Sequence, residues 1–216
     1  MSAKANDENL TQARKAARHI IAIDPRFAAV IKRSGLSTIG ARSGKRRAGE
    51  SNFASLASSI LSQQLSTKAA ATIISRVEIL SGGTLNPERI AELRKSELRK
   101  AGCSEAKARA ITELALVTVS KEIPISSLHR LRDEEIMEYL LPLFGIGRWT
   151  VEMFLMFQLG RPDIWPVGDL GVRRGWEKIH RMRTEIEPQV LEKIGRKYSP
   201  YRSHVAWYCW RALEVL

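Results

Sequence analysis

Helical periodicity is the feature that most constrains how this chain can fold. Apolar residues recur every three to four positions through most of the sequence, whereas alternating apolar and polar runs typical of strands are missing. Two clear apolar stripes are Phe53, Leu56, Ile60 and Leu61, and Ile111, Leu114, Ala115 and Val119. The sequence therefore predicts an all-α fold.

Capping and stop residues set the expected limits of the helices. Ser51 is a good N-cap for a helix that starts at residue 52, as are Ser66 or Thr67 and Asp133 for two later helices. Pro87 should open a short helix. Further helices are expected at 10–23, 149–159, 170–180, 188–197 and 200–215, and the Gly-, Ser- and Arg-rich segment 33–51 is expected to be a loop.

The stretch LFGIGRWTVEMF, residues 143–154, places a glycine turn before a helix that is apolar on all sides and therefore expected to be central. Gly145 and Gly147 allow backbone dihedrals that other residues resist, and they permit a close approach to another surface. Amides at the start of the second helix could donate to a phosphate. An ordinary corner between two helices often carries glycine as well, so the turn alone assigns no function.

Charge points to a polyanionic partner. The chain has 35 Lys and Arg against 23 Asp and Glu, which gives a net charge of +12 and a pI near 10.1. Such an excess is typical of nucleic-acid-binding domains, and a solvated basic surface is the alternative. The clusters at 44–47 and at Arg173-Arg174 could contact phosphates or simply be solvated.

Other functional classes are disfavoured by composition. Cys103 and Cys209 form no CxxC pair and the four histidines are scattered, which argues against zinc ribbons, cysteine-held iron–sulfur clusters and side-chain metal sites. No apolar run reaches the roughly 20 residues that span a bilayer, and the N-terminus does not resemble a secretory signal. We expect an intracellular protein without membrane segments.

Asp169 is the second signal, about twenty residues beyond the glycine turn, in WPVGDLGVRRG. It could simply be the N-cap of the helix expected at 170–180. The alternative is a catalytic carboxylate held in a cleft.

The longer stretch LFGIGRWTVEMFLMFQLGRPDIWPVGDLGVRRG resembles the hairpin-Gly/Pro-Asp signature of the helix-hairpin-helix (HhH-GPD) DNA glycosylase superfamily. Within it, the chain is most similar to the 3-methyladenine DNA glycosylase II (AlkA-like) branch, which ASSILSQQLSTKAAATI, GCSEAKARAI and SPYRSHVAWYCWRA also resemble. The resemblance covers roughly residues 50–213. It implies a single glycosylase unit of two helical lobes flanking a cleft. One lobe would be 51–165, ending in the hairpin motif 141–150, and the other would be 1–50 with 166–216.

The resemblance also implies roles for individual residues. Asp169 matches the catalytic aspartate, Gln64 the wedge that fills the gap left by the flipped base, and Trp149 and Trp210 the lining of the base pocket. The DNA backbone would be bound by Gly145, Ile146, Gly147, Arg148 and Thr150. The carbonyls of Leu141, Leu143 and Ile146 match a site for a structural Na⁺ or K⁺, with no other cofactor required. Arg202 and Ser203 would lie at the rim of the cleft.

The position of Trp149 bears on the type of reaction. The lyase members of the superfamily carry a lysine there, and tryptophan cannot form a Schiff base. The resemblance therefore implies a monofunctional, monomeric glycosylase that flips alkylated purines out of damaged duplex DNA and hydrolyses them, without AP-lyase activity. Two alternatives stay open. One is excision of uracil, hypoxanthine or mispaired adenine, for which Glu152 and Glu177 could supply a second acid. The other is a non-catalytic DNA-binding module.

Overall fold

The computed structural model describes residues 3–41 and 50–216, which form two compact units. The hairpin unit comprises 50–154, and the aspartate unit comprises 3–41 together with 155–216. The basic cluster 44–47 lies outside the described residues. No strand occurs in 3–41 or 50–216, so the all-α prediction is confirmed. None of the described helices is long and apolar enough to cross a membrane.

The boundary between the units lies between Phe154 and Leu155, eleven residues earlier than the expected limit at 165. The reason is packing within the aspartate unit. The Trp165 ring lies 6.3 Å from the Trp176 ring, edge to face. Trp165 also covers Gly195 so closely that a Cβ there would lie 2.1 Å from the indole nitrogen. Segment 155–165 therefore belongs with the residues that follow it.

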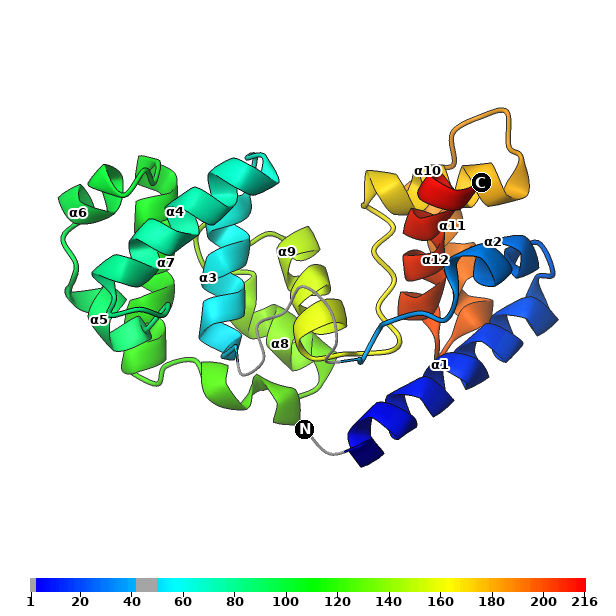
Figure 1. Ribbon diagram of the computed structural model, residues 1–216, viewed down its shortest axis with the longest axis horizontal. Coiled ribbons are helices and arrows are strands. Elements are labelled where there is room, and N and C mark those ends of the chain that lie inside the picture. The colour runs from blue at the N-terminus through cyan, green and yellow to red at the C-terminus, as the bar shows by residue number, and fades with distance from the viewer. Residues whose placement is uncertain (1–2, 42–49) are drawn as a thin grey trace. The chain divides into compact units, whose positions relative to one another are not determined.

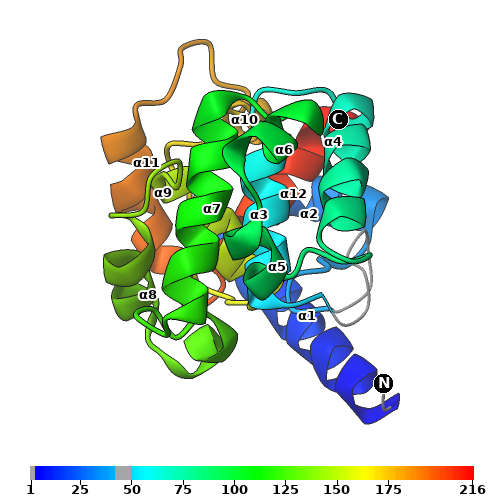
Figure 2. The same cartoon turned by 90° about the vertical axis from the view of Figure 1, so that its left-hand side faces the viewer.

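Helix α3 (Asn52–Ser62) is the central element of the hairpin unit (Figures 1 and 2). It packs against α4, α7, α9 and the 3-10 helix η1, and its predicted apolar stripe is buried. The other helical elements of this unit are α4 (Thr67–Leu80), α5 (Pro87–Glu92), α6 (Lys95–Lys100), α7 (Glu105–Val119), η1 (Ile125–Arg130), α8 (Asp133–Leu140) and α9 (Arg148–Met153).

The capping predictions had mixed outcomes. Ser51 and Ser66 are N-caps, and each side chain accepts a hydrogen bond from the third amide beyond it. The prediction for Asp133 is wrong, because α8 begins at that residue and Arg132 occupies the cap position, where its amide donates to Glu135. On α7 the predicted stripe ends early: Val119 is 44% exposed.

The aspartate unit is built around the C-terminal helix α12 (Arg202–Val215). This helix packs against α10 (Leu170–His180), α2 (Phe27–Ser34) and α1 (Ala3–Ile23), as Figure 1 shows. The remaining elements are α11 (Pro188–Gly195) and the 3-10 helix η3 (Arg196–Tyr198).

The predicted helix 149–159 is shorter than expected. It is α-helical to Met153 and continues as a π-helical turn, η2 (Phe154–Gln158). It is also not buried on all sides. Val151, Phe154 and Leu155 are buried, whereas Trp149 and Phe157 are 49% and 41% exposed. Two large aromatic rings are therefore available at the surfaces of the two units.

Candidate active site

Asp169 is held in one orientation at the start of α10. Its Oδ1 accepts a hydrogen bond from the Val172 amide at 2.8 Å and another from the Trp210 indole Nε1 at 2.8 Å. The side chain is half-buried. Asp169 is thus the N-cap of α10, as one of the two interpretations held. The cap also fixes the carboxylate, which a catalytic role requires.

Trp210 reaches Asp169 because residue 171 is a glycine. A Cβ on Gly171 would lie 2.8 Å from Trp210 Cδ1 and 2.9 Å from its Nε1, well inside contact distance. The Trp210 ring also packs against Phe157, with ring centres 5.7 Å apart and planes inclined by 31°. Trp210 therefore orients Asp169, in addition to the base-pocket role predicted for it.

The hairpin turn needs glycine at one of its two glycine positions. Gly145 has φ +81°, and a Cβ there would lie 2.8 Å from the Ala110 Cβ on α7. Gly147 has φ −95° and ψ 168°, which any residue adopts, and nothing lies within 4 Å of its Cβ position. The expectation of special dihedrals at Gly147 is therefore wrong.

Some hairpin amides are already engaged inside the protein. The Ile146 amide donates to the Leu143 carbonyl at 3.2 Å, and the Phe144 amide donates to Glu113 Oε1 at 3.0 Å. Helix geometry leaves the amides of Arg148 and Thr150, in the first turn of α9, without an acceptor in their own helix. The amides of Arg148 and Thr150 are therefore candidates for the predicted phosphate contact, and a contact through Ile146 stays a prediction.

Gln64 lies in the turn that follows α3. Its side chain is exposed and its φ is +56°, a left-handed conformation that non-glycine residues rarely adopt. The neighbouring Gln63 donates from its side-chain amide to the Gly145 carbonyl at 2.9 Å, so the turn is tied to the hairpin. This bond could not be predicted from local sequence patterns, because the two residues are 82 positions apart.

The predicted site residues thus fall into two groups. Asp169 and Trp210 are brought together in the aspartate unit. Gln64, Trp149 and the hairpin residues are carried by the hairpin unit.

The predicted cation site consists of backbone carbonyls. Leu141 and Leu143 follow the end of α8, and Ile146 precedes α9. The Leu143 carbonyl accepts from the Ile146 amide, and a carbonyl oxygen has a second lone pair for another partner. Carbonyl oxygens are ligands that hard cations accept. These residues are therefore chemically suited to Na⁺ or K⁺.

Four other polar residues were predicted at the rim of the cleft or as a second acid, and each interacts with other residues of the protein. Arg202 donates from Nε and Nη2 to the two oxygens of Asp163, both at 2.9 Å, and its position at the rim of a cleft stays a prediction. Ser203 is fully buried and accepts from the Ile164 amide. Glu177 accepts from the Ile186 amide and from Arg174. Glu152 is buried, 3.8 Å from Arg148.

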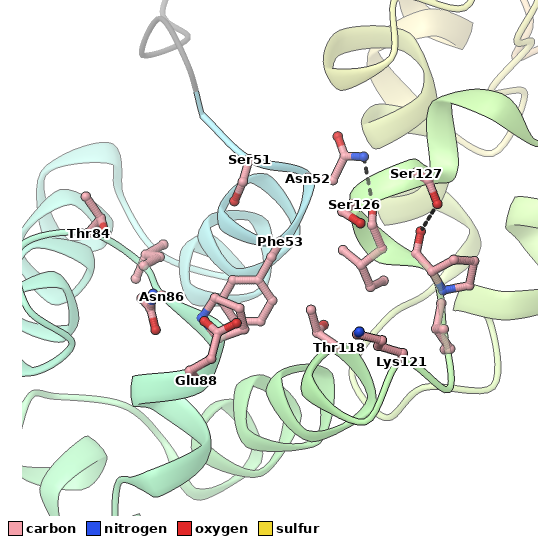
Figure 3. A pocket seen from close by; sticks show the side chains of 15 residues that line it. Ser51, Asn52, Phe53, Thr84, Asn86, Glu88, Thr118, Lys121, Ser126 and Ser127 are labelled. Carbon is pink, nitrogen blue, oxygen red and sulfur yellow. Dashed lines mark hydrogen bonds between the residues drawn. The ribbon is translucent and has the colours of Figure 1, made fainter.

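A pocket of about 630 Å³ opens in the hairpin unit between the starts of α3 and α5 and the end of α7 (Figure 3). Phe53 and Leu85 line its apolar part, and Asn52 donates across it to the Ile125 carbonyl. None of the predicted site residues lines this pocket. It is therefore separate from the candidate site.

Comparisons with known proteins indicate the same family of DNA repair proteins over most of the chain. The model of the HhH-GPD superfamily of base excision DNA repair proteins matches residues 57–200. DNA-3-methyladenine glycosylase 1 of Schizosaccharomyces pombe is 32% identical over 212 residues, which cover 97% of this chain and 91% of the relative.

Two solved structures are also similar. One is a 3-methyladenine DNA glycosylase of the same yeast in complex with abasic DNA. It is 31% identical with a TM-score of 0.75, and the match covers 91% of this chain and 95% of that one. The other is a DNA-3-methyladenine glycosidase from Bacillus halodurans. It is 34% identical with a TM-score of 0.79, and the match covers 91% and 88% of the two chains.

Proposed function

Because the chain belongs to the HhH-GPD superfamily of base excision DNA repair proteins, we propose that it hydrolyses alkylated purines from duplex DNA. The substrates are bases of the 3-methyladenine and 7-methylguanine type. Relatives named DNA-3-methyladenine glycosylase, matched over nearly the whole chain, support this assignment. The observation that carries it is Asp169, a half-buried carboxylate held by two N–H donors.

The chemistry follows from the leaving group. Alkylation at N3 or N7 makes a purine cationic, so it leaves the sugar without a strong general acid. Breaking the bond to C1′ builds positive charge on the sugar, and a fixed carboxylate stabilises that charge electrostatically. Because the Trp210 and Val172 donors already orient Asp169, no reorganisation is required during the reaction. The same carboxylate orients the attacking water.

Recognition begins with extrusion of the damaged base. Leaving the stack costs about a few kcal/mol, and less for a damaged base. Gln64 fills the gap, and the amides at the start of α9 bind the DNA backbone. The exposed Trp149 ring can stack on a cationic purine, a contact worth about 0.5–2 kcal/mol. Such stacking selects electron-poor purines without a strict hydrogen-bond pattern.

The reaction stops at the abasic site. Trp149 stands where a lyase would have its lysine, and an indole nitrogen cannot attack the sugar carbon to form a Schiff base. Water is then the nucleophile, and the DNA backbone stays intact. The protein acts as a monomer.

A Na⁺ or K⁺ ion, when bound, would supply positive charge beside a DNA phosphate. The carbonyls of Leu141, Leu143 and Ile146 would hold it. The hairpin residues themselves fix the turn, because Gly145 packs against Ala110 and the Phe144 amide is anchored on Glu113.

The deciding experiment incubates the full chain with methylated duplex DNA and measures release of free 3-methyladenine and 7-methylguanine. We expect both bases to be released, and no release at high protein concentration would exclude the proposal. Asp169→Asn should keep its affinity for abasic DNA and lose turnover, because it removes the charge and preserves the cap. Wild-type turnover in this variant would remove Asp169 from the mechanism.

The lyase question has its own measurement. Abasic DNA incubated with the protein and borohydride should give no covalent adduct and no strand cleavage. A trapped adduct would show a Schiff base and contradict the assignment of a monofunctional enzyme.

A further inference from the structure

The turn that carries Gln64 is strained. Gln63 has φ −53° and ψ 133°, Gln64 has φ +56°, and the Leu65 amide donates back to the Ser62 carbonyl at 3.3 Å. These values describe a type II turn, in which the third position normally belongs to glycine. A residue with a Cβ in this conformation costs on the order of 1 kcal/mol or more.

A backbone conformation of lower energy, the type I turn, is available to the same four residues, 62–65. Type I and type II turns differ mainly by a half rotation of the central peptide, here the one joining Gln63 to Gln64. In a type I turn Gln64 would have a negative φ without strain, and its side chain would leave the backbone in another direction. Some contact must therefore hold the central peptide in its type II orientation.

Lys107 makes that contact. It lies on α7, and its Nζ donates to the carbonyl of Gln63 at 2.8 Å and to the carbonyl of Leu61 at 2.8 Å. The Gln63 carbonyl belongs to the central peptide of the turn, so rotating that peptide would break the bond. The Leu61 carbonyl lies in the last turn of α3, where the carbonyls receive no hydrogen bond from an amide of their own helix. A positive charge is favourable at this end of a helix.

The same helix also positions the hairpin. Ala110, one turn after Lys107, packs against Gly145, and Glu113, one turn further, accepts from the Phe144 amide. The Gln63 side chain closes the connection by donating to the Gly145 carbonyl. One face of α7 thus fixes both the turn of Gln64 and the loop predicted to hold the DNA backbone.

We propose that Lys107 is a positioning residue for base flipping, which holds the Gln63–Gln64 peptide so that Gln64 is presented to the DNA stack. This inference rests on the proposed function, in which Gln64 is the wedge. Lys107 acts through Gln64 and the backbone and does not touch the reacting atoms. Its loss should impair flipping and leave binding of undamaged DNA unchanged.

The test compares Lys107→Met with Lys107→Arg and Lys95→Met in the full chain. Methionine keeps the unbranched stem of the side chain, one atom shorter and without donors, and arginine can donate to both carbonyls. Lys95→Met removes the same charge from an exposed position on α6. The readout is the fluorescence of 2-aminopurine next to a tetrahydrofuran abasic-site analogue, which rises when a wedge unstacks the neighbouring base.

We expect Lys107→Met to lose at least about half of the fluorescence gain and about tenfold of the single-turnover rate of base release. Its affinity for undamaged duplex should stay within about twofold of wild type. Lys107→Arg should restore most of the fluorescence, and Lys95→Met should match wild type. If Lys107→Met does not fold, Lys107→Gln replaces it, because its shorter, uncharged side chain cannot make both contacts to the Leu61 and Gln63 carbonyls. The same loss of fluorescence gain is then expected.

Two results would overturn the inference. One is a wild-type fluorescence gain in Lys107→Met. The other is an equal loss of fluorescence gain in Lys107→Met and Lys95→Met. This result would mean that Lys107 contributes only its positive charge and does not position the turn. The analogue contains no base to excise, so this signal is independent of chemistry. Absence of base release by the wild-type protein would count against the proposed function instead.

Discussion

At the scale of single residues, the Asp169 carboxylate depends on partners that are themselves constrained. The Trp210 N–H reaches Oδ1 because Gly171 has no side chain to displace the indole. A hydrogen bond to a charged group contributes about 1.5–3 kcal/mol. The orientation of the Asp169 carboxylate thus depends on Gly171 and Val172 of α10 and on Trp210 of α12.

Trp210→Phe tests this arrangement, because it keeps the aromatic packing on Phe157 and removes the N–H. We expect turnover of methylated DNA to fall by about tenfold, with affinity for abasic DNA within about twofold of wild type. Gly171→Ala should have the same effect by displacing the indole. Turnover at the wild-type rate in both variants would exclude the positioning role.

His204 gives a prediction about pH and stability. Its side chain is buried beside Ser37, with Nδ1 3.0 Å from Oγ, and burial lowers the pKa of His204 to about 4. An unfolded chain would bind this proton near pH 6.5. The unfolded state therefore holds more protons between these values. The contribution of neutral His204 to the free energy of unfolding is fully present above about pH 6.5 and is lost as the pH falls toward 4.

The loss between pH 6.5 and 4 should be on the order of 3 kcal/mol, measured by urea unfolding at a series of pH values. His204→Asn keeps a polar atom near Ser37 and does not titrate. It should be less stable at pH 7 and show a flatter profile over this window. An unchanged slope in the variant would assign the acid sensitivity to other groups.

At the scale of helices, the aspartate unit depends on one close crossing. A Cβ on Gly175 of α10 would lie 1.9 Å from the Cys209 carbonyl oxygen on α12, so the two backbones are in direct contact. Because backbone atoms cannot move aside as a flexible side chain can, the helices would have to separate. This crossing also brings Trp210, the residue after Cys209, close to Asp169.

Gly175→Ala should therefore lower the free energy of unfolding by at least about 3 kcal/mol. Gly168→Ala is the matched control, because nothing lies within 4 Å of its Cβ position, and it should change stability by less than about 1 kcal/mol. Urea denaturation of both variants provides the comparison. Similar stability of the two would show that the α10–α12 crossing relaxes at little cost.

Much of this architecture is predictable from the sequence because local signals specify it. Ser51 and Ser66 cap helices as their residue type favours, and the stripe of α3 is buried. Contacts between distant positions leave no such signal. Three hydrogen bonds depend on how the helices cross, which hydrophobic periodicity does not specify. They join Lys107 to Gln63, Gln63 to Gly145, and Trp210 to Asp169. Gly147 shows the converse, since its glycine suggests a special conformation that the backbone does not adopt.

At the scale of the whole molecule, charge and chemistry are separable. The net charge of +12 attracts any DNA, whereas the role proposed for Asp169 concerns a single nucleotide. Binding to phosphates releases counterions, so the logarithm of the binding constant falls linearly with the logarithm of the salt concentration. Bond cleavage assisted by the Asp169 carboxylate, as proposed, does not release these counterions. Salt should therefore affect the two steps differently.

Affinity for undamaged duplex, measured by fluorescence anisotropy from 50 to 300 mM NaCl, should fall with a logarithmic slope of about −3 or steeper, near −0.9 for each phosphate contacted. Single-turnover release of 7-methylguanine at saturating protein should change by less than about twofold over the same range, because the complex is already formed. A release rate that falls in parallel with affinity would mean that counterion-linked contacts form only in the transition state. In that case the basic surface would be part of catalysis, and the separation of charge from chemistry would fail.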